Sequence, residues 1–351
     1  MAYCILVSSN TDFIYTLSFN PALGSLDLEH KTQAGHHPSW ITSYPQDNSL
    51  IFTGLEHQEG KIVALKFDEG KGSLAKIITS GGSDPCSLAT TERELLVANY
   101  SGGGVAFLPI SAEPPYLLTS SPDTVVMSGH GPNKDRQQTS HPHQVVLIKE
   151  YEELLVPDLG ADKVWRLKKD SSGLWKLQGQ IQYEPGSGPR HAVYHEGYLY
   201  TVCELSNQVV KHLLLPLPSE PEYIASASTL SDPPPTPHSM TAAEILLPKP
   251  NPTFPTPYLY VSNRSDPSPE GDTIAIYSVA NPSQLELVNE VRTGLNHVRG
   301  MEFGGPDNQW LVVGGLFAGG VKVFERINDG KDLRIVAENE EVEAPAGFLW
   351  V

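Results

Sequence analysis

The chain has 351 residues, which is long for one ordinary domain, although repeat proteins often run larger. Its 24 Lys+Arg against 41 Asp+Glu give a formal net charge of −17, which argues against nucleic acid as a partner. The cysteines Cys4, Cys86 and Cys203 form neither a disulfide framework nor a CxxC metal motif. No stretch approaches the ~18 apolar residues of a membrane span, and the N-terminus lacks a basic leader. We therefore expect a cytoplasmic protein without a membrane anchor.

A short apolar strand that ends in a small or polar turn recurs along the chain. The copies are ILVSSN from Ile5, LIFTGL from Leu50, LLVANY from Leu95, LLVPDL from Leu154, LYTVCEL from Leu199, LYVSNR from Leu259 and LVVGGL from Leu311. Each is followed by a second strand with aromatic or β-branched alternation, such as FIYTLSF from Phe13 and VKVFER from Val321. Seven such units match the roughly 40–50 residues of a propeller blade, and helical periodicity is nearly absent. The sequence predicts an all-β fold, a seven-bladed β-propeller with four-stranded antiparallel blades.

The two ends of the chain predict how the ring closes. The chain begins with a strand, CILVSS, and ends with GFLWV, which is a good strand former. We expect the last residues to complete the first blade, since an open ring would leave sheet edges unpaired. The prediction is a single domain over residues 1–351. Segments rich in Pro, Ser, Gly or Gln are expected to be surface loops without core potential: 111–140, 216–237, 248–257 and 265–271.

Polar segments stand at equivalent places in several blades, and a propeller brings such places together at its central channel. They are HPHQVVL (141–147) just before the inner strand of the fourth blade, GSGPRHAVYH (186–195) opening the fifth, CELSN (203–207) ending that blade's second strand, SNR (262–264) at the equivalent turn of the sixth, and NHVRGMEF (296–303) opening the seventh. We expect these segments to form one site.

The residue types suggest proton transfer and anion binding. His143 can exchange a proton near neutral pH. Glu204 follows apolar strand residues, so we expect desolvation to raise its pKa. Arg190, Arg264 and Arg299 are expected at corresponding points of three successive blades, where they would clamp carboxylates or phosphate. The expected partner is therefore a small anionic substrate, with no metal and no cofactor.

Structural roles remain open for the same residues. His141, His191 and His195 are interpreted as turn or packing residues. Glu204 would then pair with a channel arginine, and the arginines would tie blade to blade. Asn99, Asp158 and Asn263 are expected to satisfy backbone amides in turns.

These segments resemble the lactonase family of seven-bladed propellers, which includes bacterial 6-phosphogluconolactonases and the fungal 3-carboxy-cis,cis-muconate lactonizing enzyme. GSGPRHAVYH…YLYTVCELSNQVV is the strongest match, and HPHQ, NYSGGGV, YLYVSNR and R-G-x-x-F (299–303) also fit, in order over the whole chain. The resemblance implies that His143 and Glu204 transfer protons and that Arg190 and Arg264 hold substrate carboxylates. Val298 stands where the family's PRGF pattern has proline, which leaves open whether Arg299 sits differently.

Our leading functional hypothesis is a lactone-forming cycloisomerase of the 3-carboxymuconate type. In this reaction a substrate carboxylate adds across a double bond, and the arginines stabilise the developing enolate. The alternative in another reaction class is hydrolysis of a phosphorylated sugar lactone, with His143 activating water. A non-catalytic propeller that binds a partner through its rim is a third hypothesis, because the fold alone does not settle function.

Overall fold

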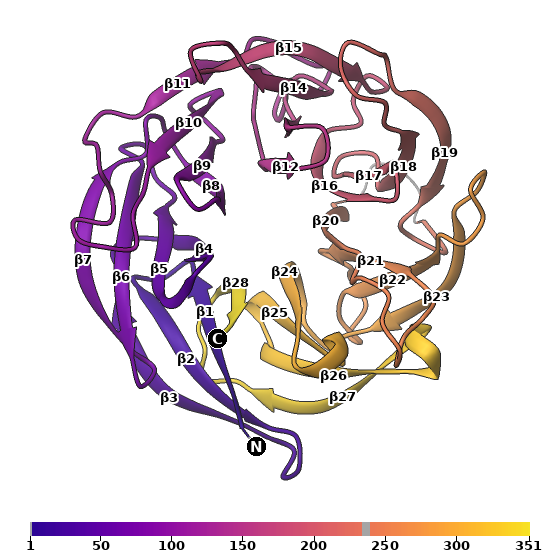
Figure 1. Ribbon diagram of the computed structural model, residues 1–351. Helices are drawn as coiled ribbons and strands as arrows, with labels where there is room; N and C mark the ends of the chain where they lie inside the picture. The colour runs from indigo at the N-terminus through magenta and orange to yellow at the C-terminus, as the bar shows by residue number, and fades with distance from the viewer. Residues whose placement is uncertain (1, 234–238) are drawn as a thin grey trace.

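The computed structural model describes residues 2–233 and 239–351. These residues form seven four-stranded antiparallel sheets arranged around one axis (Figure 1). The predicted seven-bladed β-propeller is thus confirmed. Within the described ranges the helical segments are two single 3₁₀ turns, η1 (Pro306–Asn308) and η2 (Asn328–Gly330). None of the helices in these ranges is long and apolar enough to cross a membrane.

In every blade the strand named first lies nearest the axis, and the strand named last lies outermost (Figure 1). Blade 1 holds β28 (Pro345–Trp350), β1 (Tyr3–Ser9), β2 (Phe13–Asn20) and β3 (Ser25–Gln33), and blade 2 holds β4 (Pro38–Tyr44), β5 (Asp47–Leu55), β6 (Lys61–Asp68) and β7 (Lys71–Thr79). Blade 3 holds β8 (Pro85–Thr90), β9 (Glu94–Asn99), β10 (Gly104–Pro109) and β11 (Asp123–Val126), and blade 4 holds β12 (Val146–Ile148), β13 (Glu153–Asp158), β14 (Lys163–Lys169) and β15 (Trp175–Gln182). Blade 5 holds β16 (Pro189–His195), β17 (Tyr198–Cys203), β18 (Gln208–Leu213) and β19 (Glu222–Ser228). Blade 6 holds β20 (Thr241–Leu246), β21 (Tyr258–Arg264), β22 (Thr273–Ser278) and β23 (Glu286–Arg292), and blade 7 holds β24 (Asn296–Gly304), β25 (Trp310–Ala318), β26 (Gly320–Ile327) and β27 (Asp332–Asn339).

The hydrophobic core lies between the blades. Each pair of neighbouring blades shares one apolar cluster; between blades 1 and 7, for example, Ile5 and Val7 pack with Trp310 and Val312. The second strand of a blade is covered on both faces, and every residue of β13 is buried. This two-sided burial explains the continuous apolar runs that recur in the sequence.

The ring closes as expected. Strand β28 pairs antiparallel with β1, with Leu349 opposite Leu6 and Phe348 opposite Val7. Strand β28 is therefore the innermost strand of blade 1 (Figure 1).

The strand pair that recurs in the sequence consists of the second and third strands of each blade. The expectation that its first member is the inner strand of the fourth blade is therefore wrong. The segment 141–147 does not precede an inner strand at Leu154, because the innermost strand of blade 4 is β12 and LLVPD forms β13. The innermost strands do not show the recurring apolar run, because they are short or are irregularly paired where they face the channel.

The expectation for two of the four loop segments is also wrong in part. Residues 111–140 include β11, the outermost strand of blade 3, and residues 216–237 include β19, the outermost strand of blade 5. An outermost strand needs few apolar residues, which explains why composition hides it. Residues 234–237 of the second segment lie outside the described residues. Segments 248–257 and 265–271 are loops as predicted.

Candidate active site

Each innermost strand begins with an irregularity that sets the geometry of the channel. In blade 5, Pro189 pairs with Cys203 and His191 with Val202, so Arg190 is left out of the ladder. Such β-bulges bend a strand and redirect a side chain. We call the residues at these positions the bulge ring. Its members are Ala346, Ser39, Cys86, His143, Arg190, Ala243 and Arg299.

A second set of residues stands at the ends of the second strands, opposite the bulges. This turn ring includes Glu56, Tyr100, Glu204 and Arg264. Both rings lie at the same end of the blades, because an antiparallel second strand ends where the innermost strand begins. Arg190 and Arg299 do correspond, but Arg264 belongs to the other ring, so the expectation of three equivalent arginines is wrong.

Three arginines meet on the carboxylate of Glu204. Its Oε2 lies 3.0 Å from Arg190 Nε and 2.8 Å from Arg264 Nη2, and its Oε1 lies 2.5 Å from Arg136 Nη2. Backbone carbonyls hold two of these guanidinium groups, since Arg190 Nη1 donates to Ala243 at 2.6 Å and Arg264 Nη2 donates to Ala242 at 3.0 Å. The cluster is an excess of positive charge in a strongly acidic protein.

The protonation state of Glu204 differs from the expectation. Burial alone would raise its pKa, but the charges of Arg264, Arg190 and Arg136 outweigh burial and lower the pKa to about 2. The predicted rise in pKa is therefore wrong, because the neighbouring charges exceed desolvation. Glu204 is ionised at neutral pH and pairs with channel arginines, as the structural interpretation anticipated. Its predicted part in proton transfer stays a prediction.

Arg299 occupies the bulge of blade 7 and reaches blade 2. Its Nη2 lies 3.0 Å from Glu56 Oε2, and the charge of Glu56 raises its pKa. Val298 pairs with Gly315 and Gly300 pairs with Gly314, so Arg299 is left unpaired in a bulge equivalent to that of Arg190 in blade 5. Valine in place of proline therefore does not displace this arginine.

His143 begins a chain of hydrogen-bonded side chains. Its Nδ1 lies 3.2 Å from His191 Nε2, and His191 Nδ1 lies 2.7 Å from Glu244 Oε1. Burial and the charge of Arg190 lower the pKa of His143 well below its usual value, so the ring is neutral. His191 is buried, and its ring lies within hydrogen-bond distance of both His143 and Glu244; its interpretation as a turn or packing residue stays a prediction.

An aromatic side chain supports these histidines. The ring of Trp40 in blade 2 meets the ring of His191 in blade 5 edge-on at 5.5 Å between centroids, and its Nε1 donates to the Leu88 carbonyl at 2.9 Å. Trp40, Glu244 and Glu302 line a cavity of about 60 Å³.

Two aspartates of blade 4 hold the backbone that carries the site. Asp158 accepts the His141 amide at 2.6 Å and the Gly160 and Ala161 amides at 3.0 Å. This confirms the expected turn role of Asp158. The same expectation is wrong for Asn99 and Asn263, whose Nδ2 groups donate to the Ser80 and Thr229 carbonyls. Asp162 accepts the Gly186 and Gly188 amides at 2.7 and 2.8 Å, which fixes the segment before Arg190.

Sequence reasoning missed Arg136, Glu56 and Glu244. Arg136 lies in the segment predicted as a surface loop, although it reaches Glu204. One signal was available for the bulge ring, because proline precedes the bulge in five blades. These prolines are Pro38, Pro85, Pro142, Pro189 and Pro345. Blade 6 lacks this proline, so the signal would not have found Glu244.

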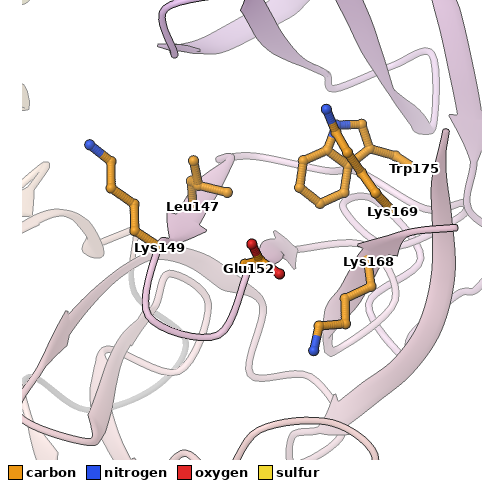
Figure 2. Close-up of a pocket in the computed structure, with 6 residues that line it drawn as sticks. All are labelled: Leu147, Lys149, Glu152, Lys168, Lys169 and Trp175. Atoms are coloured by element: carbon orange, nitrogen blue, oxygen red, sulfur yellow. The ribbon is translucent and has the colours of Figure 1, made fainter. Parts of the chain in front are cut away.

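A separate cavity of about 330 Å³ lies at the opposite end of blade 4, where Lys149 follows β12 and Glu152 precedes β13 (Figure 2). The carboxylate of Glu152 stands between Lys149 and Lys168 (Figure 2). Three lysines in all surround the cavity, but none of the predicted site residues lines it. Among residues 2–233 and 239–351, no group of three His, Cys, Asp or Glu is placed to hold a metal ion.

The bulged propeller with its arginine-rich channel defines a known class. Residues 4–350 match the family described as lactonase, seven-bladed beta-propeller, and the chain belongs to this family. Among its relatives is the 6-phosphogluconolactonase of Bacillus subtilis, 27% identical over 319 residues, or 88% of this chain and 86% of the relative. Another is the 6-phosphogluconolactonase of Formosa agariphila, 28% identical over 91% of this chain and 90% of the relative.

Solved structures share the fold. A protein from Lactobacillus plantarum superposes with a TM-score of 0.85 at 22% identity over 100% of both chains. The periplasmic gluconolactonase of Pseudomonas aeruginosa gives 0.80 at 22% identity over 100% of this chain and 99% of its own. The names of the relatives favour the hydrolase alternative over the cycloisomerase that was our leading hypothesis from sequence.

Proposed function

We propose that the protein hydrolyses a phosphorylated sugar lactone of the 6-phosphogluconolactone class. The single observation that carries the proposal is the convergence of Arg136, Arg190, Arg264 and Arg299 beside a neutral His143 at one end of the channel. A phosphate and a polarised lactone carbonyl both need cations, while the attack of water needs a base. The names of the relatives support the same reaction.

The depth of each arginine indicates which part of the substrate it would meet. Arg190 and Arg264 lie deep in the site, with 2% and 7% of their side chains exposed. Arg136 is the most accessible of the four, with 40% of its side chain exposed. Glu204 would keep the three guanidinium groups together by offsetting part of their mutual repulsion. We therefore assign Arg136 to the substrate phosphate and Arg190 and Arg264 to the oxyanion that forms at the carbonyl.

His143 would act as the general base. An ionised Glu204 can accept a proton only by giving up three ion pairs, whereas a neutral imidazole can accept one directly. His143 would take a proton from water, the hydroxide would add to the lactone carbonyl, and the ring C–O bond would break. The proton then returns to the alkoxide that leaves, which yields the hydroxy acid.

The test is hydrolysis of 6-phosphogluconolactone by the purified protein, followed as formation of 6-phosphogluconate above the spontaneous rate. We expect His143→Gln to lower kcat/KM by about 100-fold or more, the usual contribution of a positioned base. His212→Gln is the matched control. His212 is a buried histidine of β18 in blade 5 that lies within hydrogen-bond distance of Tyr183 and belongs to neither the bulge ring nor the turn ring.

The assays can overturn both the substrate class and the role of His143. Hydrolysis no faster than the spontaneous rate at high protein concentration would exclude this substrate class. If 3-carboxymuconate instead lost its diene absorbance in a parallel assay, the cycloisomerase would replace it. If the lactone is hydrolysed but His143→Gln and His212→Gln behave alike, His143 is not the base.

A further inference from the structure

The side chains of His143, His191 and Glu244 form a continuous hydrogen-bonded chain that joins blades 4, 5 and 6. The distances are 3.2 Å between His143 Nδ1 and His191 Nε2 and 2.7 Å between His191 Nδ1 and Glu244 Oε1. All three side chains are nearly excluded from solvent, with 5%, 1% and 6% of the residue exposed. The buried end of the chain is a carboxylate and the other end is the proposed base.

The chain has one direction when Glu244 is a carboxylate. Its Oε1 also accepts the Ile245 amide at 3.0 Å, so it accepts rather than donates at His191. The proton of His191 then sits on Nδ1, and Nε2 is left to accept from His143 Nδ1. His143 is thereby held as the tautomer with a free lone pair on Nε2. This atom has no hydrogen-bond partner in the described part of the chain.

The surroundings make a lasting imidazolium at His143 unfavourable. Arg190 Nη1 lies 3.4 Å from His191 Nε2, and Arg190 and Arg299 lower the pKa of both histidines in addition to burial. A base in this position needs a route that carries the positive charge away from the arginines. Glu244 is a negative group at the far end of such a route.

We propose that His191 and Glu244 are positioning residues that hold His143 in its basic tautomer and receive its proton during hydrolysis. The inference rests on the proposed lactonase function. A water proton passes to His143 Nε2, the Nδ1 proton of His143 passes to His191 Nε2, and the Nδ1 proton of His191 passes to Glu244 Oε1. The hydroxide adds to the carbonyl. The three transfers run backward when the ring oxygen leaves as an alkoxide and takes up the proton.

The fold holds the buried end of this chain rigidly. Two residues of β20, Ala243 and Glu244, share one partner position on β21 in the bulge of blade 6. The Glu244 amide donates to Ser262 Oγ at 3.0 Å, and Ser262 Oγ donates to the Val298 carbonyl of blade 7 at 3.1 Å. The edge-on contact of Trp40 at 5.5 Å covers His191 on another side. Such support from packed neighbours is what a positioning residue requires.

Glu244→Gln tests the chain through kinetics. The carboxamide oxygen keeps the Ile245 amide and can still accept from His191 Nδ1, but a carboxamide carries no negative charge and cannot take up the His191 proton, so the relay is broken at its buried end. We expect kcat for 6-phosphogluconolactone to fall by about 100- to 10,000-fold, the range seen for bases and their orienting groups, with KM changed by less than about threefold. A solvent-isotope proton inventory should show several protons in wild type and one in the variant. A merely structural role would lower kcat and the melting temperature together and leave the inventory unchanged.

Imidazole NMR of the resting protein tests the tautomers without any substrate. In wild type we expect ¹⁵N signals of a protonated Nδ1 and a bare Nε2 for His143, and of a protonated Nδ1 for His191. If wild type shows a bare Nδ1 on His143, the inference is overturned even where lactone is hydrolysed. If the tautomers are as expected but no lactone is hydrolysed, the proposed function fails instead.

Two controls separate the chain from general damage to the core. Glu302→Gln changes a carboxyl in the wall of the same cavity, and Glu302 Oε1 accepts the Phe303 amide at 3.1 Å outside the chain of hydrogen bonds. His212→Gln changes a buried histidine elsewhere in blade 5. Both should keep kcat within about threefold of wild type at pH 7. A loss of kcat in both as large as in Glu244→Gln would overturn the inference.

Discussion

The carboxyl group of Glu302 lies in the wall of the cavity that it shares with Glu244 and Trp40. Burial and the negative charge of Glu244 raise the pKa of Glu302 to about 8, so it is protonated in the folded state at neutral pH. In the unfolded chain the carboxyl titrates near its usual value of about 4.3. Between these two values the folded state binds more protons than the unfolded state, so the free energy of unfolding falls as pH rises.

We predict that Glu302→Gln flattens this pH dependence. The slope from Glu302 alone has a limit of about 1.4 kcal/mol per pH unit between about pH 4.5 and 8. The observed slope should be smaller, because the side chain keeps some contact with solvent. Urea unfolding of both proteins at pH 5, 6, 7 and 8 measures the difference, which should grow in favour of the variant with pH. A constant difference would show that Glu302 titrates normally.

The chemistry of the predicted residues indicated where they lie in the fold, but not how they interact with one another. His143, Glu204, Arg190, Arg264 and Arg299 all belong to one end of the channel. Their types and places in the repeat were enough to gather them. The sign of the pKa shift at Glu204 was not predictable, because it depends on three distances of 3.0 Å or less that no spacing encodes. Arg136 was hidden for the same reason.

At the scale of the strand, the bulge at the start of each innermost strand redirects one side chain and so brings residues of different blades together at one end of the channel. The residue preceding the third strand supports this geometry in three successive blades. Asp162 holds the Gly188 amide of blade 5, Asn207 holds the Met240 carbonyl of blade 6, and Asp272 holds the Val298 amide of blade 7. Each of these three blades thus positions the bulge of the next blade. The sequence contains these Asn and Asp residues, but only strand bounds reveal their common position.

We predict that Asp162→Ala disturbs the site through the backbone. The change leaves the Gly186 and Gly188 amides without an acceptor, at about 1–3 kcal/mol for each buried group left unsatisfied, and leaves Gln137 Nε2 with only the Leu159 carbonyl at 2.8 Å. We expect a loss of unfolding free energy of about 3 kcal/mol and a rise in KM, because Gln137 and Gly188 flank Arg136 and Arg190. Asp170→Ala in the exposed turn of blade 4 is the control and should change neither value.

If Asp162→Ala lost stability but kept the wild-type KM for 6-phosphogluconolactone, the aspartate would support the fold without placing the arginines. If both variants lost stability equally, the contacts of Asp162 would carry no special weight. The comparison is informative because each aspartate accepts two or more backbone amides at about the same distances.

At the scale of the whole molecule, the repeat predicted the ring because seven blades must bury the same two faces. The order of strands within a blade was harder to predict. The innermost strands lack a continuous apolar run where they line the channel, and outermost strands such as β15 and β19 alternate or are largely exposed. Only the second and third strands, packed between neighbouring blades, leave a clear periodic signal. The closure of the ring was predictable because both chain ends are strand formers.

The closing strand β28 joins the two ends of the chain in blade 1, so the stability of the whole ring depends on its packing. Phe348 in β28 is 6% exposed and packs in the cluster between blades 1 and 7. Truncating a buried phenylalanine costs about 3–5 kcal/mol. We therefore expect Phe348→Ala to lower the free energy of unfolding by about that amount, and to do so in one cooperative transition because all blades share the ring.

Phe317→Ala is the matched control, since Phe317 is the same residue type at 70% exposure in blade 7. It should change the free energy of unfolding by less than about 0.5 kcal/mol. Urea unfolding followed by tryptophan fluorescence and by circular dichroism measures both variants. If Phe348→Ala were as mild as Phe317→Ala, β28 would contribute little to the stability of the ring. If its two probes gave separate transitions, blade 1 would open before the rest, and the exposed edge of β1 should then promote association between chains.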